Sequence, residues 1–298
     1  MTILAATAGD WSVEPLQLAP LVVVTLAYVR RARTLARRGR PVSSTRQSCF
    51  YGGVCMVLVA FVSPIDSIGE ERLFWVHMSQ HLLLGDLGPL AIVLGLNGPL
   101  LRPLLALPLV RRLRVLAHPL VALPLWTANL YVWHLSAVYE AALAHAALHA
   151  LEHVCFFTAG ALMWAAVVEP LPGPAWFGAG WKAVYVLAVR TAGAVLANVF
   201  IWAGQPLYDR YAPGERASGI SPAADQTIGG AIMFIEGGVV TLVAFAWLFL
   251  RWTREAELRQ RLLERGAEPH AASRSARYGR SAAARTRGST RGGPEPSP

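Results

Sequence analysis

The segment Phe74–Pro89, FWVHMSQHLLLGDLGP, carries ionisable side chains within an apolar run that is long enough to enter a membrane. His77 and His81 are four residues apart, so on a helix they share one face, about one turn from each other. Asp86 follows in the same run. Ionisable groups inside hydrocarbon are costly, and they usually mark a site or the interior of a helix bundle. The segment therefore predicts a transmembrane helix that carries a site.

A second segment, His145–His153, reads HAALHALEH and repeats the spacing of four residues between histidines. If both helices cross the membrane in the same direction, the two sets of histidines lie at matching depth near the outer surface. Imidazole suits zinc, copper and haem iron, so two such pairs can supply four nitrogens to one ion. The alternative is that each histidine hydrogen-bonds a neighbouring helix and binds nothing. The candidate metal ligands are His77, His81, His134, His145, His149 and His153.

The composition is that of a membrane protein. Of the 298 residues, 54% are hydrophobic and only 15% are charged, whereas soluble proteins carry about 25% charged residues. The net charge of +9 is concentrated in the arginine-rich segments Arg30–Arg46, Arg102–Arg114 and Arg251–Arg291, which flank apolar runs. This distribution is typical of cytoplasmic loops under the positive-inside rule and argues against a nucleic acid partner.

A spanning helix needs about 20 residues, and seven apolar segments are candidates, of which the first two are short. They are Val13–Tyr28, Cys49–Pro64, Leu73–Leu96, Val115–Ser136, Leu143–Val168, Trp181–Gly204 and Gln226–Leu250. The arginine-rich loop after the first segment is expected inside the cell, and the acidic loop Asp66–Glu71 outside. The sequence therefore predicts an all-α, polytopic transmembrane bundle with seven spans, an outer N-terminus and an inner C-terminus.

The chain is expected to divide into a transmembrane domain, residues 1–252, and a basic cytoplasmic tail, residues 253–298. Arg254–Arg265 is predicted to extend the last helix along the membrane surface. After Gly266 the sequence consists mainly of Ala, Ser, Arg, Gly and Pro. Such a composition offers little apolar surface to bury, and it predicts a disordered segment.

Three further ionisable residues, Asp86, Arg190 and Glu236, are predicted at similar depth on three different helices. An isolated charge at that depth costs several kcal/mol, so we expect these side chains to form one buried network. The network is either a structural ion pair that joins three helices or part of a path for protons or ions.

Other polar side chains are predicted to support the histidines through hydrogen bonds. Adjacent helical residues point about 100° apart. Glu152 therefore cannot share the face of His153 and is expected to orient a histidine of the other helix. Asp225 begins the last span and is equally a candidate N-cap for it. The supporting candidates are Asp66, Gln80, Glu152 and Asp225.

Several motifs resemble the CtaG family of cytochrome c oxidase assembly factors. They are H-M-x-Q-H-L-L-L…G-P-L at His77–Leu90, W-H-L…Y-E-A-A-L-x-H-x-x-L-H-x-L-E-H-x-x-F at Trp133–Phe156 and D-Q-x-x-G-G-x-x-M at Asp225–Met233. The resemblance covers about Gly52–Trp252. It implies a multi-pass plasma-membrane protein that helps to assemble terminal oxidase, with oxidase subunits as partners. Asp86 stands where the family pattern suggests an apolar or small residue. The matching positions are His77, Gln80, His81, Pro89, His134, His149, Glu152, His153, Asp225 and Gln226.

Three functions remain open at this point. The first is an assembly factor that holds copper at the outer histidines and passes it to an oxidase subunit. The second is an electron carrier with haem held by the histidine pairs, and the third is a metal or proton-coupled transporter. Sequence motifs for a phosphate loop, a G-x-S-x-G elbow or an H-E-x-x-H zinc protease are absent, so we expect no catalytic residues and no enzymatic activity.

Overall fold

The structure is a computed structural model that describes residues 11 and 15–279, and every regular element in these residues is helical. The predicted all-α class is confirmed. Two compact units are distinguished, the first comprising Met1–Gly173 and Tyr185–Thr241 and the second Pro174–Val184 and Leu242–Pro298. The first unit contains all the predicted site residues.

The helices of the first unit are α1 (Pro15–Arg37), α2 (Ser44–Val62), α3 (Ile65–Glu71), α4 (Phe74–Leu82), α5 (Gly88–Gly95), α6 (Gly98–Leu105), α7 (Pro108–Leu113), α8 (Pro119–Trp133), α9 (Ser136–Ala144), α10 (Ala146–Val168) and α12 (Ala212–Ser218). A π-helical turn, η2, covers Leu83–Leu87, and short 3₁₀ segments cover Arg114–Ala117 and Asp209–Tyr211. Helices α11 (Ala179–Trp202) and α13 (Pro222–Glu264) contribute to both units, and α14 (Pro269–Tyr278) belongs to the second.

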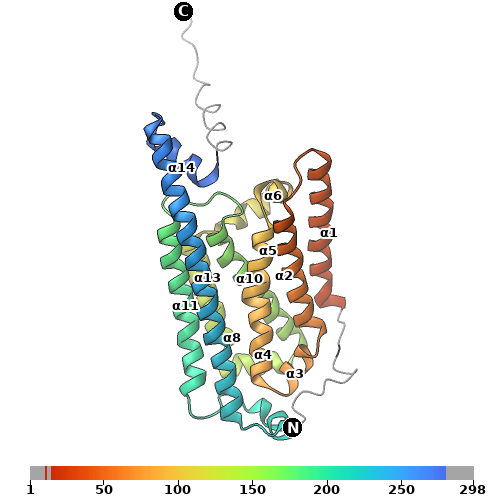
Figure 1. Ribbon diagram of the computed structural model, residues 1–298. Helices are drawn as coiled ribbons and strands as arrows, with labels where there is room; N and C mark the ends of the chain where they lie inside the picture. The colour runs from red at the N-terminus through yellow and green to blue at the C-terminus, as the bar shows by residue number, and fades with distance from the viewer. Residues whose placement is uncertain (1–10, 12–14, 280–298) are drawn as a thin grey trace, which may run out of the picture. The chain divides into compact units, whose positions relative to one another are not determined.

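The helix formed by α4, η2 and α5 is central to the first unit, and α2 and α10 lie beside it (Figure 1). Glycines allow these helices to approach closely. A Cβ atom on Gly160 of α10 would lie only 2.0 Å from the carbonyl oxygen of Gly85 in η2. On the α2 side, a Cβ on Gly53 would lie 2.7 Å from the carbonyl oxygen of Gly88. Close packing against η2 places α10 beside the histidine-bearing helix α4.

Four helices of the described residues are individually long and apolar enough to cross a membrane: α2, α10, α11 and α13. Two bent pairs raise the number to six if each is one span: Phe74–Gly95 with α6, bent by 98°, and Pro108–Ala117 with α8, bent by 76°. Each bend has a local cause, because Asn97 caps the new helix α6 and Pro119 begins α8. The first predicted span, Val13–Tyr28, falls mostly in α1, which does not meet the same test, since Arg30 and Arg31 soon interrupt its apolar run.

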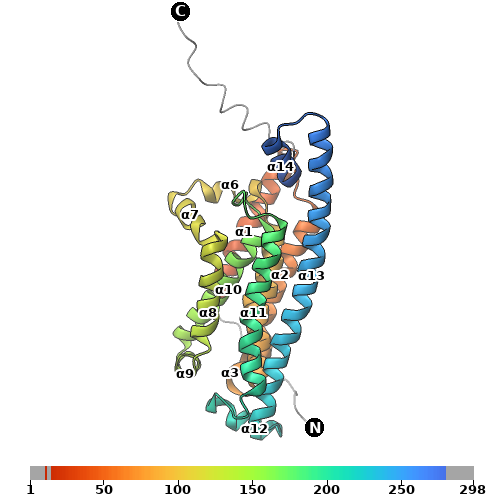
Figure 2. The same ribbon diagram turned by 90° about the vertical axis from the view of Figure 1, so that its left-hand side faces the viewer.

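Loops that were predicted on the same side of the membrane lie at the same end of the first unit. Figure 2 shows α3, α9 and α12 at one end, and all three fall wholly or partly in connections that the predicted seven-span topology puts outside. At the opposite end lie α6 and α7, which belong to the arginine-rich loop expected inside.

The second unit agrees with the predicted tail in one respect and differs from it in another. Helix α13 continues to Glu264, as expected from the extension of the last helix over Arg254–Arg265, whereas α14 forms at Pro269–Tyr278, where disorder was expected. The cause is local, because the Glu268 side chain accepts a hydrogen bond from the Ala271 N–H at 2.9 Å and Pro269 occupies the first turn. Arg277 then donates to the carbonyl oxygens of Pro174 and Ala175. The remainder of the predicted disordered tail, residues 280–298, lies outside the described residues.

Candidate metal centre

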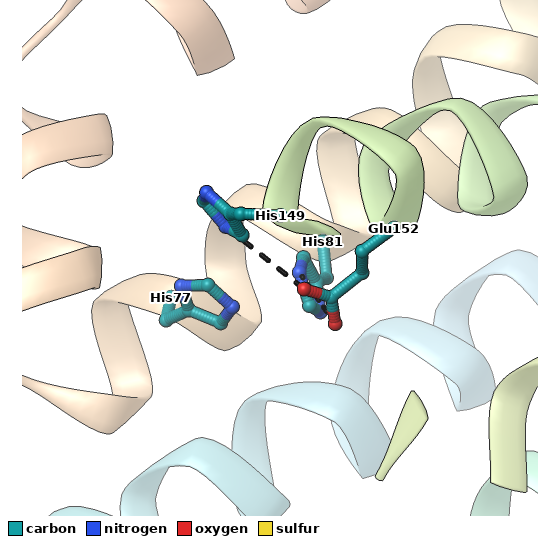
Figure 3. A group of neighbouring side chains, drawn as sticks. All are labelled: His77, His81, His149 and Glu152. Atoms are coloured by element: carbon teal, nitrogen blue, oxygen red, sulfur yellow. Dashed lines mark ion pairs between the residues drawn. The ribbon is translucent and has the colours of Figure 1, made fainter. Parts of the chain in front are cut away.

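Helices α4 and α10 bring four potential metal ligands together. His77 and His81 come from α4, and His149 and Glu152 come from α10. One ligand atom from each residue lies within 4.8 Å of those of the other three, and all four side chains are buried. Figure 3 shows the four side chains in the shared space between the two helices. We call these four residues the His₃Glu group.

The predicted histidine pairs face each other across the two helices. The ring centroids of His77 and His81 are 4.2 Å apart, and those of His149 and His153 are 4.1 Å apart. Between the helices, His77 lies 5.5 Å from His149, and His81 lies 5.8 Å from His153. The spacing of four residues on each helix therefore produces a compact assembly of four imidazole rings.

Many polar atoms of this assembly lack a hydrogen-bond partner among the described residues. They are both ring nitrogens of His77, His81 and His153, both carboxylate oxygens of Glu152, and Nε2 of His134 and His149. A single buried polar group without a partner costs about 1–3 kcal/mol. The alternative in which every histidine bonds a neighbouring helix does not describe this arrangement. The donor set fits a bound cation, which would take up lone pairs from several of these atoms at once.

The other predicted ligands, His134, His145 and His153, do not belong to the His₃Glu group. The His134 ring is 6.1 Å from the His81 ring, and its Nδ1 is 2.7 Å from the carbonyl oxygen of Leu130. His153 also packs against Phe61, with 5.4 Å between the ring centroids. His145 is exposed and precedes the first turn of α10 in an extended conformation, so it does not follow the face of that helix.

Glu152 lies within the group, where the sequence predicted a supporting position. Its Oε1 is 3.7 Å from Nε2 of His81, and its Oε2 is 4.0 Å from Nε2 of His149. The prediction compared Glu152 with its neighbour His153. The relevant comparison is with His149, three residues earlier, because residues at i and i+3 share a helix face.

Hydrogen bonds to α2 and α3 support the group. Gln80 donates from Nε2 to Asp66 at 2.6 Å and to the carbonyl oxygen of Ala60 at 3.0 Å. The sequence did not single out Glu70, whose Oε1 lies 2.9 Å from Nδ1 of His149. The signal was present, because Asp66 and Glu70 are four residues apart, but the segment was interpreted as a loop without helical faces.

Asp225 caps α4 instead of its own helix. Its carboxylate accepts hydrogen bonds from the backbone N–H groups of Phe74, at 2.8 Å, and Trp75, at 3.0 Å. Helix α13 begins earlier, at Pro222, and Ser221 accepts from the Ala224 N–H there. The prediction of an N-cap on the last span is therefore wrong for Asp225. The residue anchors the beginning of α4, one turn before His77.

The three ionisable residues that were predicted to form one buried network do meet. Arg190 donates two hydrogen bonds to Asp86, one of them at 3.0 Å, and lies 3.7 Å from Oε2 of Glu236. Trp164, which the sequence did not indicate, donates from Nε1 to Asp86 at 2.7 Å. Asp86 lies within the π-helical turn η2, a feature frequent at functional sites.

Comparisons with known proteins identify the family of this sequence. The sequence pattern of the cytochrome c oxidase caa3 assembly factors matches residues 26–255. Uncharacterized proteins of Mycobacterium bovis and Mycobacterium tuberculosis are each 22% identical over 264 residues, covering 82% of this chain. The chain spans only 40% of the length of these relatives. No solved structure matches the chain. Because the family pattern covers most of the sequence, this protein belongs to the family of cytochrome c oxidase caa3 assembly factors.

Proposed function

We propose that the protein is an integral membrane factor that holds copper in the His₃Glu group and passes it to a cytochrome c oxidase subunit. The observation that carries the proposal is the set of buried, unpartnered donor atoms on α4 and α10. Three imidazoles and one carboxylate suit Cu²⁺, whereas Cu⁺ prefers thiolate and thioether ligands. The partners are the oxidase subunits and the lipid bilayer.

The proposal includes a topology in the plasma membrane. Helix α1 also crosses the membrane, which brings the number of spans to seven. The N-terminus lies outside and the C-terminus lies inside. The arginine-rich segments support this orientation. The shared end of α3, α9 and α12 supports the placement of these three segments on one and the same side of the membrane. The His₃Glu group then lies near the outer face, where a copper centre of an oxidase subunit would be loaded.

The test is the copper content and visible spectrum of the full chain purified in detergent. Wild type should retain copper added as Cu²⁺, and the double variant His81→Ala/His149→Ala should retain almost none. His145→Ala is the matched control, because this histidine is exposed and lies outside the group. Equal copper retention in wild type and the double variant, at matched folding, would contradict copper binding. An intense Soret band would instead support the haem-binding carrier.

A measurement in cells separates assembly from simple stability. His81→Ala should lower the oxidase activity of membranes while the level of the protein itself stays unchanged. If the histidines only stabilised the fold, the protein level would fall first and the oxidase activity would follow it. Unchanged oxidase activity in the variant would argue against a role of this group in assembly.

A further inference from the structure

Glu70 is the carboxylate at the outer edge of the His₃Glu group. Its Oε1 lies 2.9 Å from Nδ1 of His149, and 33% of its side chain is exposed. The side chains of His149 and Glu152 are only 5% and 1% exposed. Glu70 thus touches the buried group from the solvent-facing side, through one histidine.

The contact selects one orientation and one tautomer of His149. A neutral imidazole carries a proton on one nitrogen, and the nitrogen that faces a carboxylate takes it. Nδ1 of His149 is therefore the donor to Glu70, and the lone pair of Nε2 is available to the group. Nε2 has no hydrogen-bond partner among the described residues and lies 4.0 Å from Glu152.

Helix α3 is held firmly enough to fix this contact. A Cβ on Gly69 would lie 3.0 Å from both the Cα and the backbone nitrogen of His77, so α3 packs on the backbone of α4 at the group itself. One turn earlier, Asp66 accepts the hydrogen bond from Gln80 of α4. These two attachments place Glu70 at a defined position beside α10.

We propose that Glu70 is a positioning residue for the metal cargo, acting through His149. The inference rests on the proposed function, since it assumes a cation at the His₃Glu group. A carboxylate that accepts from the second nitrogen of a ligating histidine fixes the ring and makes it a better ligand. Removing such a partner typically lowers metal affinity about 10–100-fold.

The experiment measures Cu²⁺ affinity of the full chain in detergent, by competition with a chelator, together with the electron paramagnetic resonance spectrum. Glu70→Ala should weaken binding about 10–100-fold and change the nitrogen couplings of the bound Cu²⁺. Glu70→Gln should lose less Cu²⁺ affinity than Glu70→Ala, because the amide oxygen of glutamine still accepts a hydrogen bond from Nδ1 of His149. Glu71→Ala is the matched control, since it removes the same charge from an exposed position on the same helix.

A double-mutant cycle tests whether Glu70 acts through His149. In a His149→Ala background, Glu70→Ala should cause no further loss of Cu²⁺ affinity. An equal loss in both backgrounds would overturn the inference, because Glu70 would then act by its charge alone or as a ligand itself. If Glu70→Ala does not fold, Glu70→Leu removes the acceptor while keeping side-chain bulk, and the same outcomes apply.

The failure of this inference differs from the failure of the proposed function. If wild type binds Cu²⁺ and Glu70→Ala binds it equally well, the positioning role is wrong and the copper site stands. If wild type binds no Cu²⁺, both the copper site and the role of Glu70 are wrong.

Discussion

At the scale of single residues, the buried carboxylates of Asp86 and Glu236 depend on their contacts with Arg190. Asp86 accepts hydrogen bonds from Arg190 and Trp164, and Oε2 of Glu236 lies 3.7 Å from the same arginine. Oε1 of Glu236 has no hydrogen-bond partner among the described side chains and backbone groups. Arg190 is therefore the residue on which both acids depend.

Replacing Arg190 by Leu should destabilise the protein by about 3–5 kcal/mol, because two buried acids lose their cation. The triple variant Asp86→Asn/Arg190→Met/Glu236→Met should be milder, since it removes the charges together and keeps an acceptor for Trp164 Nε1. Thermal unfolding in detergent compares the two variants. A harmless Arg190→Leu change would show that these contacts contribute little to stability.

Glu215 of α12 makes the stability of the first unit depend on pH. Burial, together with the neighbouring carboxyl of Asp225, raises the pKa of Glu215 from 4.5 to about 7. A carboxyl whose pKa is raised in the folded state stabilises that state at low pH, and this contribution is lost as the pH rises through the folded pKa. The melting temperature should therefore fall between about pH 5 and pH 8.

The variant Glu215→Gln isolates this effect, because it cannot ionise and keeps nearly the same shape. Its melting temperature should depend less on pH than that of wild type over the same range. Glu140→Gln is a control, since Glu140 is an exposed residue of α9, a helix that lies at the same end of the unit as α12. Parallel pH profiles for wild type and Glu215→Gln would contradict the assignment to Glu215.

At the scale of helices, the approach of α10 to η2 decides whether the ligands of the two helices meet. A Cβ on Gly160 would lie 2.0 Å from the carbonyl oxygen of Gly85, which is backbone and cannot move away alone. Gly160→Ala should therefore push α10 outward, destabilise the protein by about 1–3 kcal/mol and weaken Cu²⁺ binding.

Gly237→Ala is the matched control for that change, because a Cβ there meets nothing within 4 Å. It should leave Cu²⁺ binding unchanged and raise stability by about 0.5–1 kcal/mol, since alanine favours a helix interior. Thermal unfolding and Cu²⁺ competition measure both variants. Equal melting temperatures and equal Cu²⁺ affinities of the two glycine variants would show that neither stability nor Cu²⁺ binding requires the close approach of α10 to η2.

The helical period was sufficient to predict which histidines share a face, and it was not sufficient to predict which helix each face meets. His77 and His81 could be paired from their spacing, because that relation is local to α4. The contact of Glu70 with His149, and of Asp225 with the first residues of α4, joins segments distant in the chain. Such contacts follow from helix packing, for which a single sequence holds no periodic signal.

At the scale of the whole molecule, charge distribution predicts the orientation. Arginine-rich segments remain cytoplasmic, so a reporter that is active only outside the membrane should give no signal when fused after residue 298. The same reporter inserted in the loop between α11 and α12, at residues 203–208, should be active. A strong signal from the C-terminal fusion would reverse the topology and place the His₃Glu group near the cytoplasmic face.

The π-helical turn η2 sets the angular relation between two sites on one helix. His77 and His81 precede it, Asp86 lies within it, and the helix continues as α5. Deleting one residue from Leu83–Leu87 would turn this segment into a regular α-helix and rotate one end relative to the other by about 100°. The histidines and Asp86 could then not both face their present neighbours. A related sequence that lacks one residue at this turn, when aligned with this chain, should therefore have lost one of the two sites.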